Sequence, residues 1–143
     1  MAEVFVRYIH FLAFMTLASV TVVQYYLVSR ELDSDTVRKL RVIDTVAGAS
    51  AIIVFFAGVM LWSVVGKPAS IYNQNWILHL KIALFVTAAL ISIIPTRYYR
   101  NFEAMGDPAI SAPGSVKIAI RVQLSILGLL PLLAALMARG YGG

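Results

Sequence analysis

Four long apolar stretches limit what this 143-residue chain can fold into. They cover about residues 5–28, 42–65, 77–96 and 116–137. At about 1.5 Å per residue, a helix of roughly 20 residues crosses the ~30 Å hydrocarbon layer of a bilayer. The bilayer interior holds no water, so each stretch must satisfy its own backbone and is expected to be helical. The sequence therefore predicts an all-α fold: one transmembrane domain over residues 1–143, an integral membrane four-helix bundle running up-down-up-down.

The composition supports a membrane protein over a soluble one. Hydrophobic residues make up 60% of the chain and charged residues only 13%, whereas soluble domains are about half apolar and about a quarter charged. The core of a soluble domain this small could not hide so much apolar surface. The first apolar run is too long for a cleaved signal peptide and has no basic region before it. With no cysteine, the chain cannot form disulfides, iron–sulfur ligation or a thiolate metal site.

The net charge of +5 gives no reason to expect nucleic-acid binding. The basic residues are scattered at the ends of the apolar stretches, where membrane proteins carry them. The sequence also contains no glycine-rich phosphate loop, zinc pattern or G-x-S-x-G elbow. The expected partner of the chain is the lipid bilayer, and no nucleic-acid partner is predicted.

The distribution of basic residues predicts how the chain is oriented. Three basic residues lie on the side of the termini: Arg7, Lys67 and Arg139. Seven flank the first and third connections: Arg30, Arg38, Lys39, Arg41, Arg97, Arg100 and Lys117. By the positive-inside rule those two connections face the cytoplasm. We therefore expect a multi-pass protein of the bacterial inner (cytoplasmic) membrane with both termini outside the cytoplasm.

Each predicted helix has one face of small or polar residues, which we expect to point into the bundle because small residues allow close packing and polar ones avoid lipid. In the first two helices these faces are Arg7, His10, Ala13, Leu17, Thr21 and Gln24, then Asp44, Gly48, Ala51, Phe55, Gly58 and Trp62. In the last two they are Lys81, Leu84, Ala88 and Ser92, then Lys117, Arg121, Ser125, Gly128, Ala135 and Arg139.

Two basic side chains share a depth on these faces. His10 and Lys81 each lie five or six residues into their helices, about 7–9 Å below the same boundary. His79 is about 200° around the helix from Lys81 and is interpreted as interfacial. His10 could instead bond a neighbour or reach the headgroups, as could Lys81 with its long stem. Two buried basic groups at one depth indicate an anionic or metal-bearing ligand between them.

Asp44 and Arg121 both stand near the opposite boundary, on faces expected to point inward. The simplest interpretation is a structural ion pair. A proton path or an anion site at the cytoplasmic side is the alternative. Met15, Met60 and Met137 are interpreted as packing residues, because no Met/His spacing of a copper site is present.

Several stretches resemble known families: YIHFLAF in the first helix, RKLRVID followed by Gly48 and Gly58, and WILHLKIALFV in the third helix. Most of the chain is similar to a small bacterial membrane family catalogued as a domain of unknown function (number 2214). The histidine of the first helix and the H-x-K of the third also resemble HemJ-type protoporphyrinogen oxidases, which are four-helix membrane proteins that bind haem b. That resemblance implies His10 and Lys81 as the functional residues.

The resemblance and the residues together lead to one hypothesis and one alternative. The hypothesis is a haem b protein with His10 and Lys81 as axial ligands of the iron and Arg7 and Arg139 near the propionates. It would be redox-active, through porphyrinogen or quinol oxidation or through electron transfer, with a quinone or porphyrinogen as partner. The alternative is a non-haem transport, accessory or scaffold bundle. The residues leave open whether the chain is an enzyme, which residues are catalytic, and whether it forms a homodimer.

Overall fold

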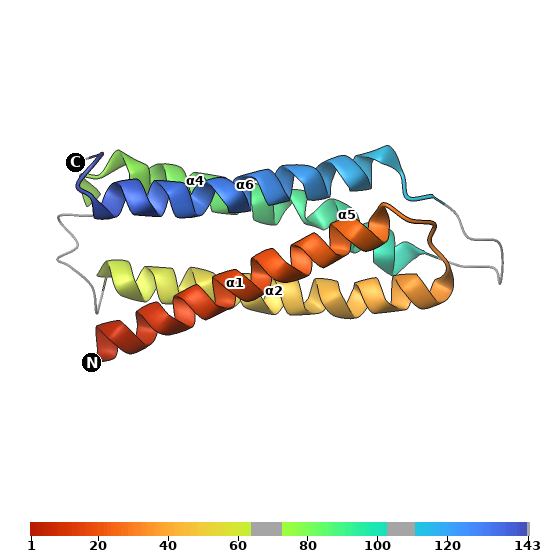
Figure 1. Ribbon diagram of the computed structural model, residues 1–143, viewed down its shortest axis with the longest axis horizontal. Helices are drawn as coiled ribbons and strands as arrows, with labels where there is room; N and C mark the ends of the chain where they lie inside the picture. Colours follow the sequence, from red (N-terminus) through yellow and green to blue (C-terminus); the bar gives the residue numbers. More distant parts are fainter. Residues whose placement is uncertain (64–72, 103–110, 143) are drawn as a thin grey trace.

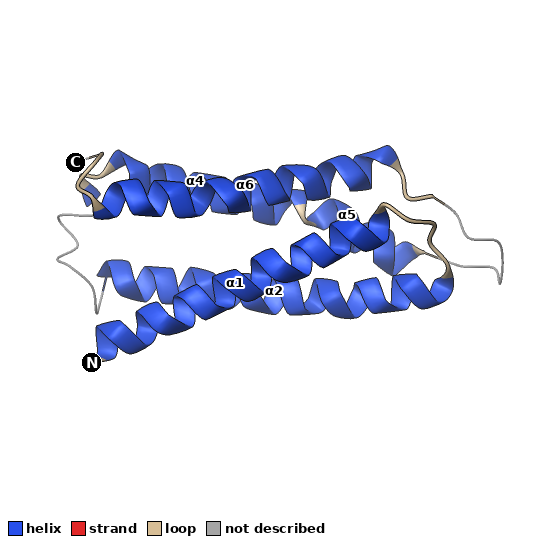
Figure 2. Ribbon diagram, in the orientation of Figure 1, coloured by secondary structure: helices blue, strands red, loops and turns tan. Residues whose placement is uncertain are grey.

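A computed structural model describes residues 1–63, 73–102 and 111–142 of the chain. Its helices are α1 (Ala2–Val28), α2 (Ser34–Ser63), α4 (Trp76–Ile91), α5 (Ile93–Asn101) and α6 (Gly114–Ala138). Four segments are long and apolar enough to span a membrane, namely α1, α2, α4 together with α5, and α6. The predicted all-α membrane bundle is thereby confirmed, and the helices run alternately in opposite directions (Figures 1 and 2).

The molecule is elongated, and its two ends differ in what they contain (Figure 1). Both chain termini lie at one end, which we call the termini end. The short connection between α1 and α2 lies at the other, which we call the turn end. The pair α1 and α2 packs most extensively, and α4 lies beside α6. The bundle is therefore two helical hairpins laid against each other.

Helix α2 begins eight residues earlier than residue 42, where its apolar stretch begins. The reason is a cap: the Asp33 carboxylate accepts a 2.8 Å hydrogen bond from the Thr36 backbone N–H. This bond holds the pKa of the exposed Asp33 carboxyl below its usual range. The polar residues from Ser34 onward thus extend the helix past the apolar stretch. The predicted end of that stretch, residues 64–65, lies outside the described residues.

The third span is longer than predicted and is broken near its middle. Residues 77–96 were expected to form the helix, but α4 ends at Ile91 and α5 continues to Asn101. Pro95 has no N–H to donate to the carbonyl four residues earlier, so a regular helix cannot pass through this point. The Ser92 hydroxyl donates to the Ala89 carbonyl at the break. Residues 97–101, beyond the predicted end of the stretch at residue 96, are therefore helical.

The largest buried cluster lies at the turn end. It combines residues from α1, α2, α5, α6 and their connections: Val28, Leu32, Val37, Leu40, Tyr99, Ala112, Val116 and Ile120. The Tyr99 hydroxyl donates to Gln24 Oε1 at 3.2 Å, which satisfies two polar groups within the bundle. Arg41 donates through Nε to the Tyr99 carbonyl at 2.7 Å, near the end of α5. All four spans are thus joined at this end.

The predicted inward faces hold for the first and third spans and fail for the other two. In the third span Ala88 is buried and Lys81, Leu84 and Ser92 are half-buried, whereas the opposite face is exposed. In α1, four of the expected residues are buried, namely Ala13, Leu17, Thr21 and Gln24. In α6 the prediction is wrong: the buried side is apolar, and most of the expected face is exposed. In α2 the buried residues are shifted by about one position, to Ala47, Ser50, Val54 and Ala57. Successive residues of a helix are about 100° apart around its axis. The expected α2 face is therefore directed to one side of α1 and not straight at it.

Candidate functional site

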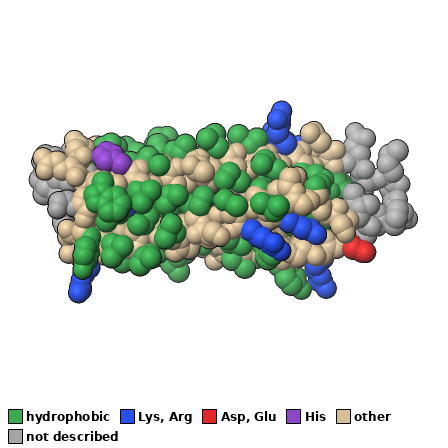
Figure 3. Space-filling model, turned by 90° about the horizontal axis from the view of Figure 1, so that it is seen from above, with side chains coloured by type: hydrophobic (Ala, Val, Ile, Leu, Met, Phe, Trp, Pro, Cys, Tyr) green, Lys and Arg blue, Asp and Glu red, His purple; other side chains and the backbone are tan. Residues whose placement is uncertain are grey.

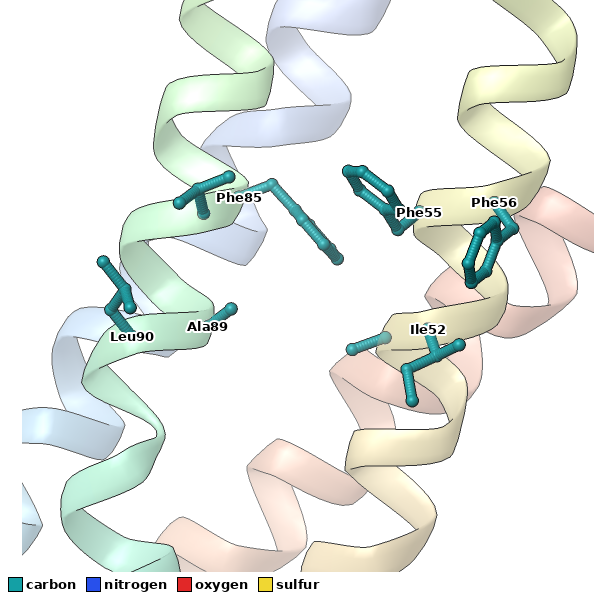
Figure 4. Close-up of a pocket in the computed structure, with 8 residues that line it drawn as sticks. Ile52, Phe55, Phe56, Phe85, Ala89 and Leu90 are labelled. Carbon is teal, nitrogen blue, oxygen red and sulfur yellow. The ribbon is translucent and has the colours of Figure 1, made fainter.

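The expected face of α2 borders an apolar slot between α2 and α4. The slot encloses about 310 Å³ and is lined by Ala51, Ile52, Phe55, Phe56, Phe85, Val86, Ala89 and Leu90. Phe55 and Phe85 project toward each other across it (Figure 4), with ring centroids 6.4 Å apart and planes 20° from parallel. Along this stretch α2 and α4 approach each other chiefly through side chains. The slot is therefore a separation between the two hairpins, lined almost wholly by hydrocarbon.

A hydrogen bond joins the walls of the slot toward the turn end. Thr96 of α5 donates its hydroxyl proton to Asp44 Oδ2 of α2 at 2.7 Å. Asp44 is half-buried there and belongs to the same face of α2 as Ala51 and Phe55. The hairpins are thus tied together on the turn side of the slot, and α2 and α4 are separated along the slot itself.

The imidazole of His10 reaches across from α1 to the backbone of α2. Its Nδ1 lies 3.0 Å from the carbonyl oxygen of Val54. A carbonyl oxygen can only accept, so this contact assigns the ring proton to Nδ1 and leaves the lone pair on Nε2. Gly58 makes the approach possible, because a Cβ at that position would lie 3.3 Å from His10 Cε1. His10 is therefore held in one tautomer, with its ring against a glycine.

Lys81 lies at the same level of the bundle as His10. Gly58 is three residues nearer the termini end than Phe55, and Lys81 is four residues nearer it than Phe85, which correspond to about 4.5 and 6 Å. Since Phe55 and Phe85 stack on each other, Lys81 and the ring on Gly58 occupy one level. Lys81 is partly buried. The structure thus brings the two predicted ligands to the termini side of the slot.

The two predicted propionate partners are placed less favourably. Arg7 is exposed and forms an ion pair with Glu3, at 2.6 Å one turn earlier in α1. Arg139 is the exposed residue that follows α6. Both arginines lie at the termini end, but neither points into the bundle as the sequence had predicted.

The predicted pair of Asp44 and Arg121 is not formed. Asp44 accepts from Thr96, while Arg121 is exposed on α6 and donates through Nε to the Tyr25 hydroxyl at 2.9 Å. The physical reason is the rotation of α6, whose apolar side packs inward and carries Arg121 outward. An arginine this near a helix end can extend to the membrane surface, so it need not face the bundle.

Other polar groups at the termini end are used in local structure. His79 is exposed, and its Nε2 lies 3.0 Å from the Asn73 carbonyl oxygen. The Asn73 side chain accepts from the Trp62 indole N–H at 2.9 Å. Within the described ranges, which omit 64–72 and 103–110, no three His, Cys, Asp or Glu residues gather as a metal site. Any metal held in this part of the chain would therefore depend on one or two ligands.

Sequence reasoning missed the supports of His10 and the aromatic pair. The Val54 carbonyl belongs to the backbone, so no residue type in the sequence could have indicated this contact. Gly58 was assigned to a face of small residues. Its contact with His10 could be predicted only if the orientation of α2 about its own axis was known. Phe85 stands four residues after Lys81, a spacing that places the two on one side of a helix and could have suggested that they share a site.

The fold and the site define an integral membrane four-helix protein that holds one histidine between its first two helices. The chain belongs to the family described as Predicted membrane protein (DUF2214), which it matches over residues 2–142. No curated protein and no solved structure matches the chain. The likeness to HemJ-type oxidases therefore rests only on the short stretches that suggested it.

Proposed function

We propose that this membrane protein binds a b-type haem in the slot between α2 and α4, with His10 Nε2 as an axial ligand. The observation that carries the proposal is the hydrogen bond between His10 Nδ1 and the Val54 carbonyl. Metal-ligating histidines typically donate their other ring N–H to a carbonyl or carboxylate, which fixes the tautomer and the ring orientation. His10 meets this condition before any ligand is considered.

The slot suits a planar apolar group. Its lining is aromatic and aliphatic, with the small residues Ala51 and Ala89 on opposite walls. Cofactor sites are commonly apolar cavities of about 300–1,000 Å³ with few polar groups, and haem sites in bundles take their ligands from facing helices. His10 and Lys81 are not among the lining residues; they lie on the termini side of the slot and would supply the polar groups there. The apolar lining is therefore compatible with the group.

Lys81 is the second candidate ligand. A lysine ligates only as the neutral amine, and partial burial among apolar residues disfavours the charged form. Arg7 can attract a propionate only by exchanging its ion pair with Glu3, which is exposed and therefore weak. Arg139 is exposed at the same end, where it can attract the second carboxylate. Without a cysteine, the attachment is non-covalent.

A bound haem would supply one-electron redox chemistry, which porphyrinogen or quinol oxidation or simple electron transfer could use. In such a site His10 and Lys81 would hold the group, and the Phe55 and Phe85 rings would lie against its apolar faces. On this proposal the protein belongs to the redox class of membrane proteins.

The proposal is tested by the absorbance of protein purified from haem-replete cells. We expect a Soret band in the wild type, its loss or displacement in His10→Ala, and an unchanged spectrum in His79→Ala. His79 is the matched control because it is the chain's other histidine, at the same end but exposed. Gly58→Ala should also shift the band, since the added Cβ presses on the His10 ring.

A colourless preparation, or a His10→Ala spectrum equal to that of the wild type, would contradict the haem assignment. The transport, accessory or scaffold alternative would then stand in its place. Lowering the pH should change the wild-type spectrum if Lys81 is the second ligand, because protonation removes its lone pair. Lys81→Met, which cannot protonate, should abolish that pH dependence.

We also propose that the turn end faces the cytoplasm and that both termini lie outside it. The support is the number of basic residues near the turn end, including Arg30, Arg38 and Lys39. Because the chain has no cysteine, Ser34→Cys and Gln74→Cys place single thiols at exposed positions at the two ends. In intact cells an impermeant maleimide should label only Gln74→Cys. Labelling of Ser34→Cys alone would reverse the orientation.

A further inference from the structure

Arg121 links α1 and α6 on the outer surface of the turn end. Its Nε donates to the Tyr25 hydroxyl at 2.9 Å, and its guanidinium lies 5.6 Å from the centroid of the Tyr25 ring. Both contacts keep the guanidinium at the seam between the two helices. Most of the lysine and arginine side chains visible in Figure 3 stand in the half of the molecule toward the turn end. Arg121 is thus an exposed cation that a tyrosine holds in place.

No carboxylate neutralises Arg121 in the part of the chain that the structure describes. The ion pairs there join Arg7 to Glu3 and join Arg38 and Lys39 to Asp35. Asp44, its predicted partner, is engaged by Thr96. Tyr25 satisfies one N–H of the guanidinium but carries no negative charge. Among the described groups the positive charge of Arg121 therefore remains uncompensated.

The surroundings of Arg121 face lipid. Ile118 and Val122, beside it on α6, are exposed, and Val22, one turn before Tyr25 on α1, is exposed as well. Arg121 stands seven residues into α6, about 10 Å along the helix axis. A charged side chain at that depth is costly unless it reaches the headgroups or pairs with an anion. The nearest abundant anions at that level are lipid phosphates.

Two more cations stand at the turn end, one on α6 and one just after α1. Lys117 lies one turn nearer the membrane boundary on α6, on the side of Arg121. Arg30 follows α1 and donates to the Tyr26 hydroxyl at 3.2 Å, with its guanidinium 5.2 Å from that ring. Basic pockets between transmembrane helices, close to the boundary, are typical places for anionic headgroups. The seam has this composition, with tyrosine hydroxyls as additional polar groups.

We propose that the α1–α6 seam at the turn end binds the phosphate headgroup of an anionic phospholipid, with Arg121 as its main contact. The guanidinium fork pairs with phosphate oxygens. Tyr25 positions the fork, and Lys117 lies toward the headgroup layer. Val22 and Ile118 adjoin the acyl chains. This site is separate from the slot between α2 and α4, so it does not depend on the haem proposal.

The test compares lipid binding by the full-length protein in detergent. Binding of dioleoylphosphatidylglycerol, dioleoylphosphatidylcholine and inorganic phosphate is measured by native mass spectrometry and by the rise in melting temperature. We expect the anionic lipid to bind and stabilise, and the zwitterionic lipid and inorganic phosphate to do so weakly. Arg121→Gln should weaken binding of the anionic lipid about fivefold, the effect of one basic residue near an anionic surface.

Arg38→Gln is the matched control, because it removes the same charge at the same end from an exposed arginine paired with Asp35. It should change binding by less than about twofold, since its neighbour already offsets the charge. Equal losses in both variants, or no loss in Arg121→Gln, would overturn the proposal. Equal stabilisation by inorganic phosphate would also overturn the assignment to a lipid.

Tyr25→Phe provides a second variant if Arg121→Gln does not fold. It keeps every charge and removes only the hydroxyl that positions the guanidinium. Loss of one hydrogen bond in a membrane protein should weaken binding about threefold. An unchanged affinity in Tyr25→Phe would contradict the site as drawn.

Discussion

The turn end and the termini end of this bundle are built from the same spans but packed in different ways. At the turn end every span contributes to one buried cluster, in which Leu32, Leu40 and Ile120 have no exposed surface. Toward the termini end a slot separates α2 from α4, and Phe55 on its wall is 44% exposed. The polar groups also differ: Gln24 and Tyr99 bond each other at the turn end, whereas His10 is bonded to backbone and Lys81 sits beside the slot.

This difference in packing gives the two ends different properties. Close packing gives a region its resistance to local opening, and loosely packed regions are where ligands enter and motion occurs. The break at Ser92 marks the boundary between the two regions, because α5 beyond it packs on both α2 and α6, while α4 before it packs on α6 and borders the slot on its α2 side. The turn end can therefore hold the hairpins together while the region of the slot is less closely packed.

The largest expected effect on stability comes from substitutions in the turn-end cluster. Ile120→Ala removes a side chain with no exposed surface and should cost about 2–5 kcal/mol of unfolding free energy. Phe55→Ala, at the slot, should cost less than about 2 kcal/mol, because part of its surface is already exposed. Unfolding in a graded detergent mixture measures both. Equal costs at the two positions would remove the contrast between the ends.

A smaller effect is expected where the two regions meet. The hydrogen bond from Thr96 to Asp44 ties the hairpins together beside the slot. A double-mutant cycle with Asp44→Asn and Thr96→Val should give a coupling of about 0.6–1.7 kcal/mol, the range for polar contacts in membrane bundles. The control cycle, Asp44→Asn with Arg121→Gln, should be additive because those residues have different partners. Coupling in the control cycle would instead support the ion pair between Asp44 and Arg121 that the sequence had predicted.

The smallest effect concerns the cap of α2, at the edge of the turn end. The pKa of Asp33 is lowered in the folded protein by the hydrogen bond from the Thr36 N–H. Its contribution is complete above the unfolded pKa of about 3.9 and is lost as the pH falls through the lower folded value. The melting temperature should therefore fall slightly below about pH 4. Asp33→Ala should flatten this part of the profile, and an identical profile would exclude the cap as its cause.

The sequence predicted the spans well and the faces unevenly. Length and hydropathy determine which segments cross a bilayer, so all four spans were found. The α1 face was correct because Ala13, Leu17, Thr21 and Gln24 recur at helical spacing and have partners on other helices. For α6 the rule that polar residues point inward failed. Its cations lie near the membrane boundary, where a side chain that points outward can also reach the headgroups or water.

The site was only partly predictable for a related reason. His10 and Lys81 could be placed at one level, because depth follows from counting residues along antiparallel helices. Their neighbours depended on the rotation of α2 and α4, which packing decides and periodicity alone does not. The contact between Gly58 and His10 belongs to this second kind. A prediction of depth is thus more secure than a prediction of face when small and apolar residues alternate.

The residues after α6 have a mechanical consequence for this site. The Gly142 carbonyl accepts from the Trp76 N–H at 3.1 Å, and the Asn75 side chain donates to the Tyr141 carbonyl at 3.2 Å. These bonds act as a clasp that fixes the axial register of α4 against α6. Lys81 stands six residues beyond Asn75 along the same helix, so the bonds that hold Asn75 also fix the height of Lys81 beside the slot. The height of the Lys81 amine beside the slot therefore depends on the hydrogen bonds that Tyr141 and Gly142 accept at the termini end.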